Sequence, residues 1–249
     1  MKSFPYDWRH SDYLNPGVLR MIDAHAIRSV CELGAHNGRD TTALQDYFDA
    51  EVHAFECHPG MIPLAREHIR SHAAAHRIRL VEKAVWDTPG RIPFYPVERT
   101  TAMDGAELDN PGASSCFRAR DDYHRRYEQG VTEVEAIRLD DYCHAEGLAG
   151  FDLLCMDIQG AALHALRGLG DRLKSVRYIL AELETRPLYH DQDLFPEVCA
   201  HLAAHGFRAA AEVKRDAWFS DYLFIAAPGR LPLAAGLRER ISRLSRGYL

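Results

Sequence analysis

The sequence predicts an α/β fold with a mainly parallel sheet, and three observations support this prediction. Short apolar runs alternate with segments in which apolar residues recur at helical spacing, as in repeated β-α units. The first run enters a turn that contains Gly34 and Gly38. Several runs end in acidic residues, at the edge where open α/β sheets bind ligands. We therefore expect one domain over residues 1–249, because 249 residues would be cramped for two full domains.

The N-terminal half contains the first predicted elements. Residues 1–28 precede the first apolar run, and we expect them to form a helical extension. Strands and helices follow at 29–35 (strand), 40–49 (helix), 51–56 (strand), 60–71 (helix) and 78–86 (strand). Pro63 is compatible with the second helix only in its first turn. A turn at 87–90 leads to an edge strand at 91–95, since prolines are confined to sheet edges.

Residues 98–133 interrupt this alternation. The segment is polar, rich in charge, and contains Asp109-Asn-Pro-Gly-Ala-Ser-Ser115. Long irregular insertions in compact domains are usually functional lids or disordered loops. We expect this one to be an irregular lid over the functional site.

The regular pattern resumes after the insertion. It predicts elements at 134–142 (strand), 151–157 (strand), 161–168 (helix), 176–184 (strand) and 193–205 (helix). The segments 207–213 and 218–226 are expected to pair as a closing antiparallel hairpin. An amphipathic helix is predicted at 233–249, where Leu237, Ile241 and Leu244 share one face. This helix would pack on the domain or on a second copy of the chain, so a homodimer is left open.

Composition and charge exclude several classes of partner. The formal net charge of −6 argues against nucleic acid, whose phosphates would repel the protein at long range. We expect no membrane association, because the apolar runs are too short to cross a bilayer. The N-terminus lacks the apolar core of a signal peptide. The six cysteines show no C-x-x-C spacing, so we expect reduced thiols in a cytoplasmic protein.

The turn after the first strand predicts a nucleotide-like cofactor. Glu32, Gly34 and Gly38 form an E-x-G-x-x-x-G pattern, and Glu56 ends the next apolar run. The spacing differs from the G-x-G-x-x-G turn that cradles a pyrophosphate, which argues against NAD. A cofactor without phosphates suits it better, and S-adenosylmethionine is the leading candidate. An ordinary strand–turn–helix is the alternative for the glycines alone, but the acid at Glu56 favours the cofactor.

Acids at the ends of four strands predict a shared polar site. They are Glu32, Glu56, Asp157 and the pair Glu182 and Glu184. Buried parallel strands otherwise exclude charge, and their carboxyl ends meet at one edge of the sheet. Glu56 would accept hydrogen bonds from the ribose hydroxyls. The cofactor-binding residues expected from these positions are Glu32, Gly34, His36, Asn37, Gly38, Thr41, Glu56, Cys57, Lys83, Ala84 and Asp157, with Lys83 and Ala84 near the adenine edge.

Three residues are candidates for orienting an acceptor and taking its proton: Asp157, Glu184 and His190. An alcohol is a poor nucleophile until it is deprotonated, so a carboxylate or histidine in contact is useful. The alternatives are a helix N-cap for Asp157 and an ordinary surface loop for His190. Asp157, Glu184 and His190, with Glu182, could hold a divalent metal such as magnesium. No spacing demands it, and no metal site is assigned.

These motifs together resemble the FkbM-type S-adenosylmethionine-dependent methyltransferases. The matching segments are Val30-Cys-Glu-Leu-Gly-Ala-His-Asn-Gly38, Val52-His-Ala-Phe-Glu56, Glu82-Lys-Ala-Val85, Ala113-Ser-Ser115, Ile137-Arg-Leu-Asp-Asp-Tyr142 and Leu154-Cys-Met-Asp-Ile-Gln-Gly-Ala161. The resemblance covers residues 28–226 and implies a Rossmann-like class I methyltransferase fold, a seven-stranded, mostly parallel sheet whose last strand is antiparallel. It implies O-methylation of a sugar, glycan or natural-product hydroxyl. The 98–133 insertion is longer than the family pattern leads us to expect, so we expect this lid to set acceptor choice.

The sequence departs from the family pattern at two positions. Family members commonly carry Glu where this chain has Gln159, and an acid where it has Ala162. These departures put catalytic roles at that turn in doubt. They leave two alternatives to O-methylation open: an N-methyltransferase or peptide-directed methyltransferase, and a cofactor-binding subunit without turnover.

Overall fold

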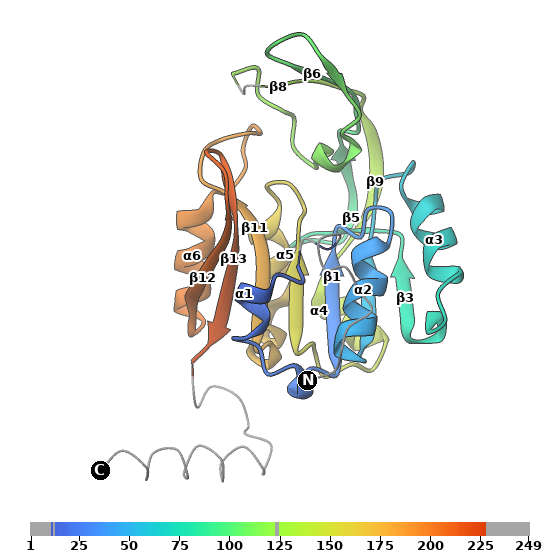
Figure 1. Cartoon of the computed structure of the whole chain (residues 1–249), viewed down its shortest axis with the longest axis vertical. Helices are drawn as coiled ribbons and strands as arrows, with labels where there is room; N and C mark the ends of the chain where they lie inside the picture. Colours follow the sequence, from blue (N-terminus) through green and yellow to red (C-terminus); the bar gives the residue numbers. More distant parts are fainter. Residues whose placement is uncertain (1–10, 12, 123–124, 228–249) are drawn as a thin grey trace.

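The computed structural model describes residues 11, 13–122 and 125–227, and a seven-stranded sheet forms its centre (Figure 1). The strand order is β12-β13-β11-β10-β1-β2-β3. The bounds are β1 (Ser29–Leu33), β2 (Glu51–Phe55), β3 (Ile78–Val81), β10 (Leu153–Met156), β11 (Tyr178–Glu184), β12 (Phe207–Arg215) and β13 (Phe219–Ala226). β13, the last strand in the sequence, is antiparallel to both of its neighbours, β11 and β12, and the other neighbouring strands in this sheet pair in parallel. The predicted fold class and hairpin are confirmed, although β13 lies inside the sheet, between β11 and β12.

Helices cover both faces of the sheet, because alternate residues of the buried strands are apolar on both sides. In β10, Leu153 and Cys155 pack toward α1 (Pro16–Leu19) and α2 (Arg39–Phe48). Leu154 and Met156 pack on the opposite face, which is covered by α4 (Leu139–Ala145), α5 (Ala162–Leu169) and α6 (Phe195–Ala204). Burying each such side chain contributes about 1.5–3 kcal/mol. This double burial fixes where the strand ends lie.

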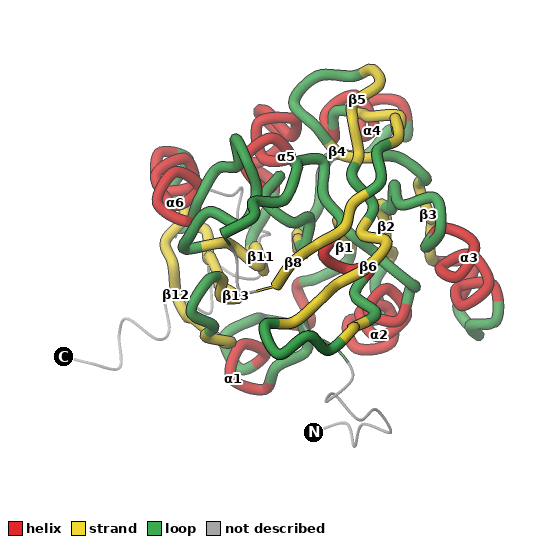
Figure 2. The backbone as a smooth tube through the Cα atoms, turned by 90° about the horizontal axis from the view of Figure 1, so that it is seen from above, coloured by secondary structure: helices red, strands yellow, loops and turns green. Residues whose placement is uncertain are grey.

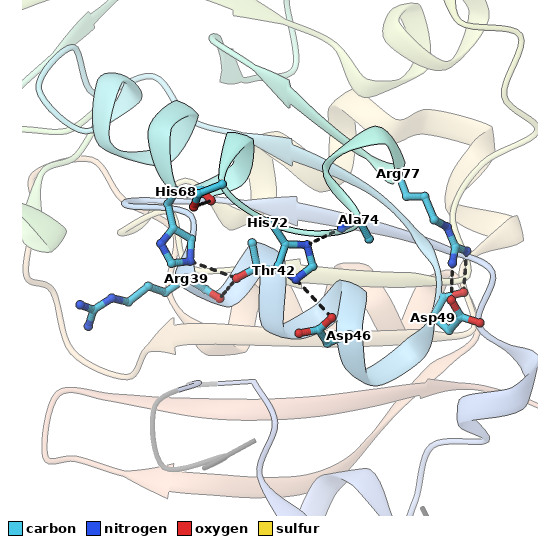
Figure 3. A network of polar contacts seen from close by, with 9 residues as sticks. Arg39, Thr42, Asp46, Asp49, His68, His72, Ala74 and Arg77 are labelled. Carbon is cyan, nitrogen blue, oxygen red and sulfur yellow. Dashed lines mark hydrogen bonds and ion pairs between the residues drawn. The ribbon is translucent and has the colours of Figure 1, made fainter. Parts of the chain in front are cut away.

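Polar contacts join α2 to α3 (Ile62–Arg70) and to the segment after it (Figure 3). The hydroxyl of Thr42 lies 3.1 Å from Nε2 of His68. Nε2 of His72 lies 3.2 Å from Asp46, so this histidine serves helix packing. These contacts hold α2 beside α3, and α2 begins directly at the glycine turn that follows β1.

The segment 78–86 was predicted as one strand but divides into two. Its first part is β3, and its second is β4 (Ala84–Val85), which belongs to another sheet of order β4-β9-β5. The partners are β5 (Gly90–Phe94) and β9 (Thr132–Ile137), so the proline-containing edge strand lies in this sheet. The chain turns where the Lys83 N–H donates to the Val81 carbonyl oxygen. The segment predicted at 134–142 likewise divides, into the end of β9 and α4.

The insertion at 98–133 is more regular than predicted. It contains a three-stranded antiparallel sheet of order β7-β6-β8, formed by β6 (Val97–Ala102), β7 (Glu107–Leu108) and β8 (Arg125–Gln129). Seen from above, β6 and β8 lie across the carboxyl ends of the central strands (Figure 2). Its strands are charged and polar, so the sequence shows no apolar alternation there.

The two ends of the chain are described only in part. Within the predicted helical extension 1–28, the described residues form α1 and a single 3-10 turn at Ala24–Ala26. The predicted C-terminal helix at 233–249, with the dimer contact that it suggested, lies outside the described residues. Along the described ranges, no helix combines the length and apolarity needed to cross a membrane.

Candidate functional site

A cavity of about 440 Å³ lies at the carboxyl ends of the central strands, beneath the insertion. Loops after β1, β2, β10 and β11 form its floor, and the insertion forms much of its roof. Its floor and wall include Gly34, Ala35, His36, Asn37, Glu56, Cys57, His58, Lys83, Ala84, Asp157, Gln159 and Glu182, and its roof includes Asp109 to Cys116, Arg125 and Tyr127. Small-molecule sites commonly have this size and place in open α/β sheets.

The glycine turn brings the loops after β1 and β10 into contact. The N–H groups of Gly34 and Ala35 both donate to the Phe55 carbonyl oxygen at 3.0 Å. Gly34 has a φ of +87°, and a Cβ added there would lie 2.0 Å from the carbonyl oxygen of Asp157. Only glycine combines this backbone conformation with this close approach. The turn therefore places Asp157 beside the predicted cofactor loop.

Backbone amides hold Glu56 in the cavity wall. Its Oε2 accepts from the N–H of His36 at 2.6 Å, and its Oε1 accepts from those of Cys57 and His58 at 2.8 and 2.7 Å. Burial raises the pKa of Glu56 to about 6, although the three hydrogen bonds oppose this shift. A carboxylate offers about four acceptor positions, so about one remains for a ligand hydroxyl, on Oε2.

Three of the predicted cofactor-binding residues lie behind the wall. Glu32 is fully buried, and its Oε2 accepts from the Thr41 hydroxyl at 2.5 Å. Burial, followed by the nearby Asp40, raises the pKa of Glu32 well above its usual value. Gly38 has a φ of +80° and packs against the backbone of Ala65. These residues support the turn from below, whereas His36, Asn37, Cys57, Lys83 and Ala84 line the cavity.

Gln159 bridges two acids at the other side of the cavity. Its Nε2 donates to Asp157 Oδ1 at 2.5 Å and to Glu182 Oε1 at 3.0 Å. Asp157, Gln159 and Glu182 all line the cavity. The structure thus brings Asp157 together with Glu182, a residue that the sequence did not single out as a catalytic candidate.

The other two candidate catalytic residues do not line the cavity. Glu184 is 2% exposed, and burial raises its pKa to about 8. It therefore stays protonated at neutral pH and cannot accept a proton there. The His190 side chain is exposed in the loop after β11, where its backbone N–H donates to Arg118. Their positions do not support the predicted roles, and the surface-loop interpretation of His190 fits better.

Several cavity residues were not predicted from sequence. Tyr13 lines the floor and is nearly buried. Burial, followed by the nearby Asp157, raises the pKa of its phenol. Arg125, Tyr127 and Phe219 also line the cavity. The alternation in Arg125-Arg-Tyr-Glu-Gln129, whose odd positions are partly buried, is the only signal that could have indicated an inward face.

The charge of the cavity suits a cationic ligand. Its lining contains five carboxyl groups (Asp40, Glu56, Asp109, Asp157 and Glu182) against one lysine and one arginine, and Lys83 pairs with Glu135 at 2.5 Å. A sulfonium with an ammonium group is favoured in such a field. The volume and the donor set therefore fit S-adenosylmethionine. Within residues 13–122 and 125–227, no three His, Cys, Asp or Glu side chains are grouped to hold a metal.

Residues 32–209 of this chain match the family model described as the Methyltransferase FkbM domain. The chain is 32% identical to the 2-O-methyltransferase NoeI of Sinorhizobium fredii (strain NBRC 101917 / NGR234) over 168 residues, which are 66% of each chain. The match thus spans about two thirds of that relative. The 31-O-demethyl-FK506 methyltransferase FkbM of Streptomyces tacrolimicus is 29% identical over 223 residues, 82% of this chain and 78% of the relative. The solved structure of an O-methyltransferase family protein from Burkholderia thailandensis aligns with a TM-score of 0.47 and 12% identity, covering 86% of this chain and 55% of that one.

Proposed function

Because the chain belongs to the FkbM methyltransferase family and takes S-adenosylmethionine as its donor, we propose that it methylates a hydroxyl of a sugar, glycan or natural product. Both curated relatives are named for O-methylation. The observation that carries the proposal is the single cavity in which Glu56 lies on one side and Asp157 with Glu182 on the other. Donor binding and proton acceptance can thus occur in one site.

The donor half of this site is the loop after β1 with the end of β2. Glu56 would accept from one ribose hydroxyl through its remaining position on Oε2. Cys57, Lys83 and Ala84 would line the adenine side, and His36 and Asn37 the methionine side. Glu32, Gly38 and Thr41 would act indirectly, by fixing the turn from below.

The acceptor half contains Asp157 and Glu182. The donor supplies an electrophilic methyl group on a sulfonium, and the acceptor supplies the nucleophilic oxygen. We assign Asp157 and Glu182 to hold the acceptor hydroxyl in line with that methyl group, and one of the two to take its proton. Alignment and proton removal are the contributions that this chain can make to an in-line displacement.

The insertion is assigned as a lid over the acceptor half. Its residues Asp109 to Cys116, Arg125 and Tyr127 line the cavity, and Figure 2 shows β8 crossing above the strand ends. Roof residues would meet the acceptor, so they would set its choice. We further propose a cytoplasmic enzyme, because all six cysteines are free, as is usual in a reducing compartment.

Two measurements test the proposal. Calorimetric titration should show binding of S-adenosylmethionine and none of NAD. Tritiated methyl donor, supplied with glycans, nucleotide sugars and aglycones, should then label at least one hydroxyl acceptor. Labelling of amines or peptides alone would favour N-methylation. Donor binding without transfer across a broad panel would favour a subunit that lacks turnover, and absence of donor binding would remove the assignment of the cavity.

A further inference from the structure

Arg125, in the roof of the cavity, is a cation without an acidic partner among the described residues. The lining contains one other lysine or arginine, Lys83, which pairs with Glu135 at 2.5 Å. Arg125 is partly buried at the start of β8. Its guanidinium forms no ion pair with any residue that the structure describes. The cavity thus holds one positive charge that the fold itself does not neutralise.

The other partly buried arginines of the described chain all have such a partner. Each forms an ion pair with a carboxylate: Arg77 with Asp49, Arg120 with Asp122, Arg138 with Asp141, Arg172 with Asp140 and Arg177 with Asp152. Removing a charge from water is costly unless an opposite charge compensates it. Arg125 is therefore the arginine for which a ligand would supply the missing partner.

The pairing of β8 directs Arg125 toward the cavity. Alternate residues of a strand face the same side, and Arg125, Tyr127 and Gln129 are the partly buried residues of β8. Gln129 fixes this inner face to the rest of the roof. Its Oε1 accepts from the Ala119 N–H at 2.8 Å, and its Nε2 donates to the Tyr95 carbonyl oxygen at 3.3 Å.

Arg125 lies on the acceptor side of the cavity. Tyr127, its neighbour on the inner face, packs on the same cluster as Phe219 at the start of β13 and Leu188 after β11. Seen from above, β8 begins over β11 and β13 (Figure 2). Glu182 of the acceptor half belongs to β11, whereas the donor loops follow β1 and β2, farther along the sheet.

We propose that Arg125 determines acceptor specificity by binding an anionic group, a carboxylate or a phosphate, on the molecule whose hydroxyl is methylated. This inference rests on the proposed function and narrows its acceptor to an acidic or phosphorylated one. The planar guanidinium presents paired N–H donors that match the oxygens of both groups. The acidic floor is compatible with such an acceptor, because the bound donor adds a sulfonium and an ammonium group against one carboxylate.

The test compares Arg125→Gln with the control Arg126→Gln. Arg126 is the next residue of β8, carries the same charge, and is exposed on the outer face. Without ligands, Arg125→Gln should unfold at the Tm of wild type, because it loses no ion pair. Arg172→Gln, which leaves Asp140 without its partner at 2.8 Å, should unfold at a lower temperature. Equal losses in Arg125→Gln and Arg172→Gln would give Arg125 a structural role and overturn the inference.

The first ligand readout is binding without turnover. Thermal unfolding is measured with S-adenosylhomocysteine present and with hexoses, the matching hexuronates or hexose 6-phosphates added at equal ionic strength. Hexuronates or hexose 6-phosphates should raise the Tm of wild type and Arg126→Gln more than the hexoses do, and this excess should be absent in Arg125→Gln. The class that gives the excess distinguishes a carboxylate from a phosphate. No excess in wild type, or an excess kept in Arg125→Gln, would overturn the inference.

The second readout is methyl transfer to the anionic acceptors that wild type labels. Arg125→Gln should lose about tenfold or more in kcat/KM, mainly through KM. Its donor Kd by calorimetry should stay that of wild type, and Arg126→Gln should behave as wild type in both. An equal loss in donor affinity would place Arg125 at the donor's carboxylate and overturn the inference, as would labelling of neutral acceptors alone. Wild type without any transfer would overturn the proposed function, while the Tm comparison would still decide the role of Arg125.

Discussion

Replacing Glu56 by alanine tests the donor half of the cavity. Three backbone N–H groups occupy about three of the four acceptor positions of this carboxylate, so one position remains for a ligand hydroxyl. A hydrogen bond to a charged group contributes about 1.5–3 kcal/mol, and about 1.4 kcal/mol changes Kd tenfold. We therefore expect Glu56→Ala to weaken S-adenosylmethionine binding about 10- to 150-fold.

Calorimetry with the donor measures this effect, and Glu51→Ala provides the control. Glu51 is exposed at the start of the same strand, β2, away from the cavity. It should bind the donor as wild type does. An unchanged donor Kd in a folded Glu56→Ala variant would refute the placement of the ribose at this carboxylate.

The pH dependence of wild type gives a second check on Glu56. Its pKa is raised by burial from 4.5 to about 6, so the neutral form is favoured in the folded state. The contribution of Glu56 to the free energy of unfolding is therefore largest below about pH 4.5, and about 2 kcal/mol of it is lost as pH rises to about 6. Donor binding should change in the opposite direction and weaken below about pH 6, because a protonated carboxyl group accepts hydrogen bonds less strongly.

Two further predictions concern the fold around the site. Gly34→Ala should lower the free energy of unfolding by about 2–5 kcal/mol in urea titrations, because its Cβ meets the Asp157 carbonyl oxygen. Gly105→Ala, at a similar φ of +84° but in open space, should cost only about 1–2 kcal/mol, and equal costs would contradict the close approach. The free energy of unfolding of Glu184→Gln should increase relative to that of wild type as pH rises from about 4.5 to about 8. The reason is that wild type contains a buried carboxyl group whose pKa is raised to about 8 and which is costly to ionise. A difference in unfolding free energy that does not change with pH would refute this.

Local patterns were sufficient to predict the central sheet and one edge of the site. The strands are short apolar runs that end in acids, and parallel strands bring their carboxyl ends together. Glu56 and Asp157 therefore both line the same cavity, on opposite sides. The same pattern could not separate Glu182 from Glu184. These two residues lie two positions apart on β11. Only the packing around the strand leaves Glu182 at the cavity and buries Glu184.

Contacts between distant segments explain what the sequence could not indicate. β4 leaves the central sheet because it pairs with β9, about fifty residues later in the chain. The β7-β6-β8 sheet is held by pairing of polar strands, so it lacks the apolar alternation that marks a strand with one buried face. Tyr13 reaches the floor of the cavity only because the segment before α1 packs on the sheet. No local pattern carries that information.

The two halves of the cavity hold their carboxylates in different ways, and this has a consequence for variation. Backbone amides hold Glu56, so no neighbouring side-chain substitution removes its partners directly. A side-chain amide holds Asp157 and Glu182, so one substitution at Gln159 changes both. Donor affinity should therefore tolerate changes at Gln159 that alter acceptor turnover. Calorimetry and kinetics on Gln159→Met would show this as a kcat that falls while donor Kd stays nearly constant, and an equal loss in both would contradict the separation.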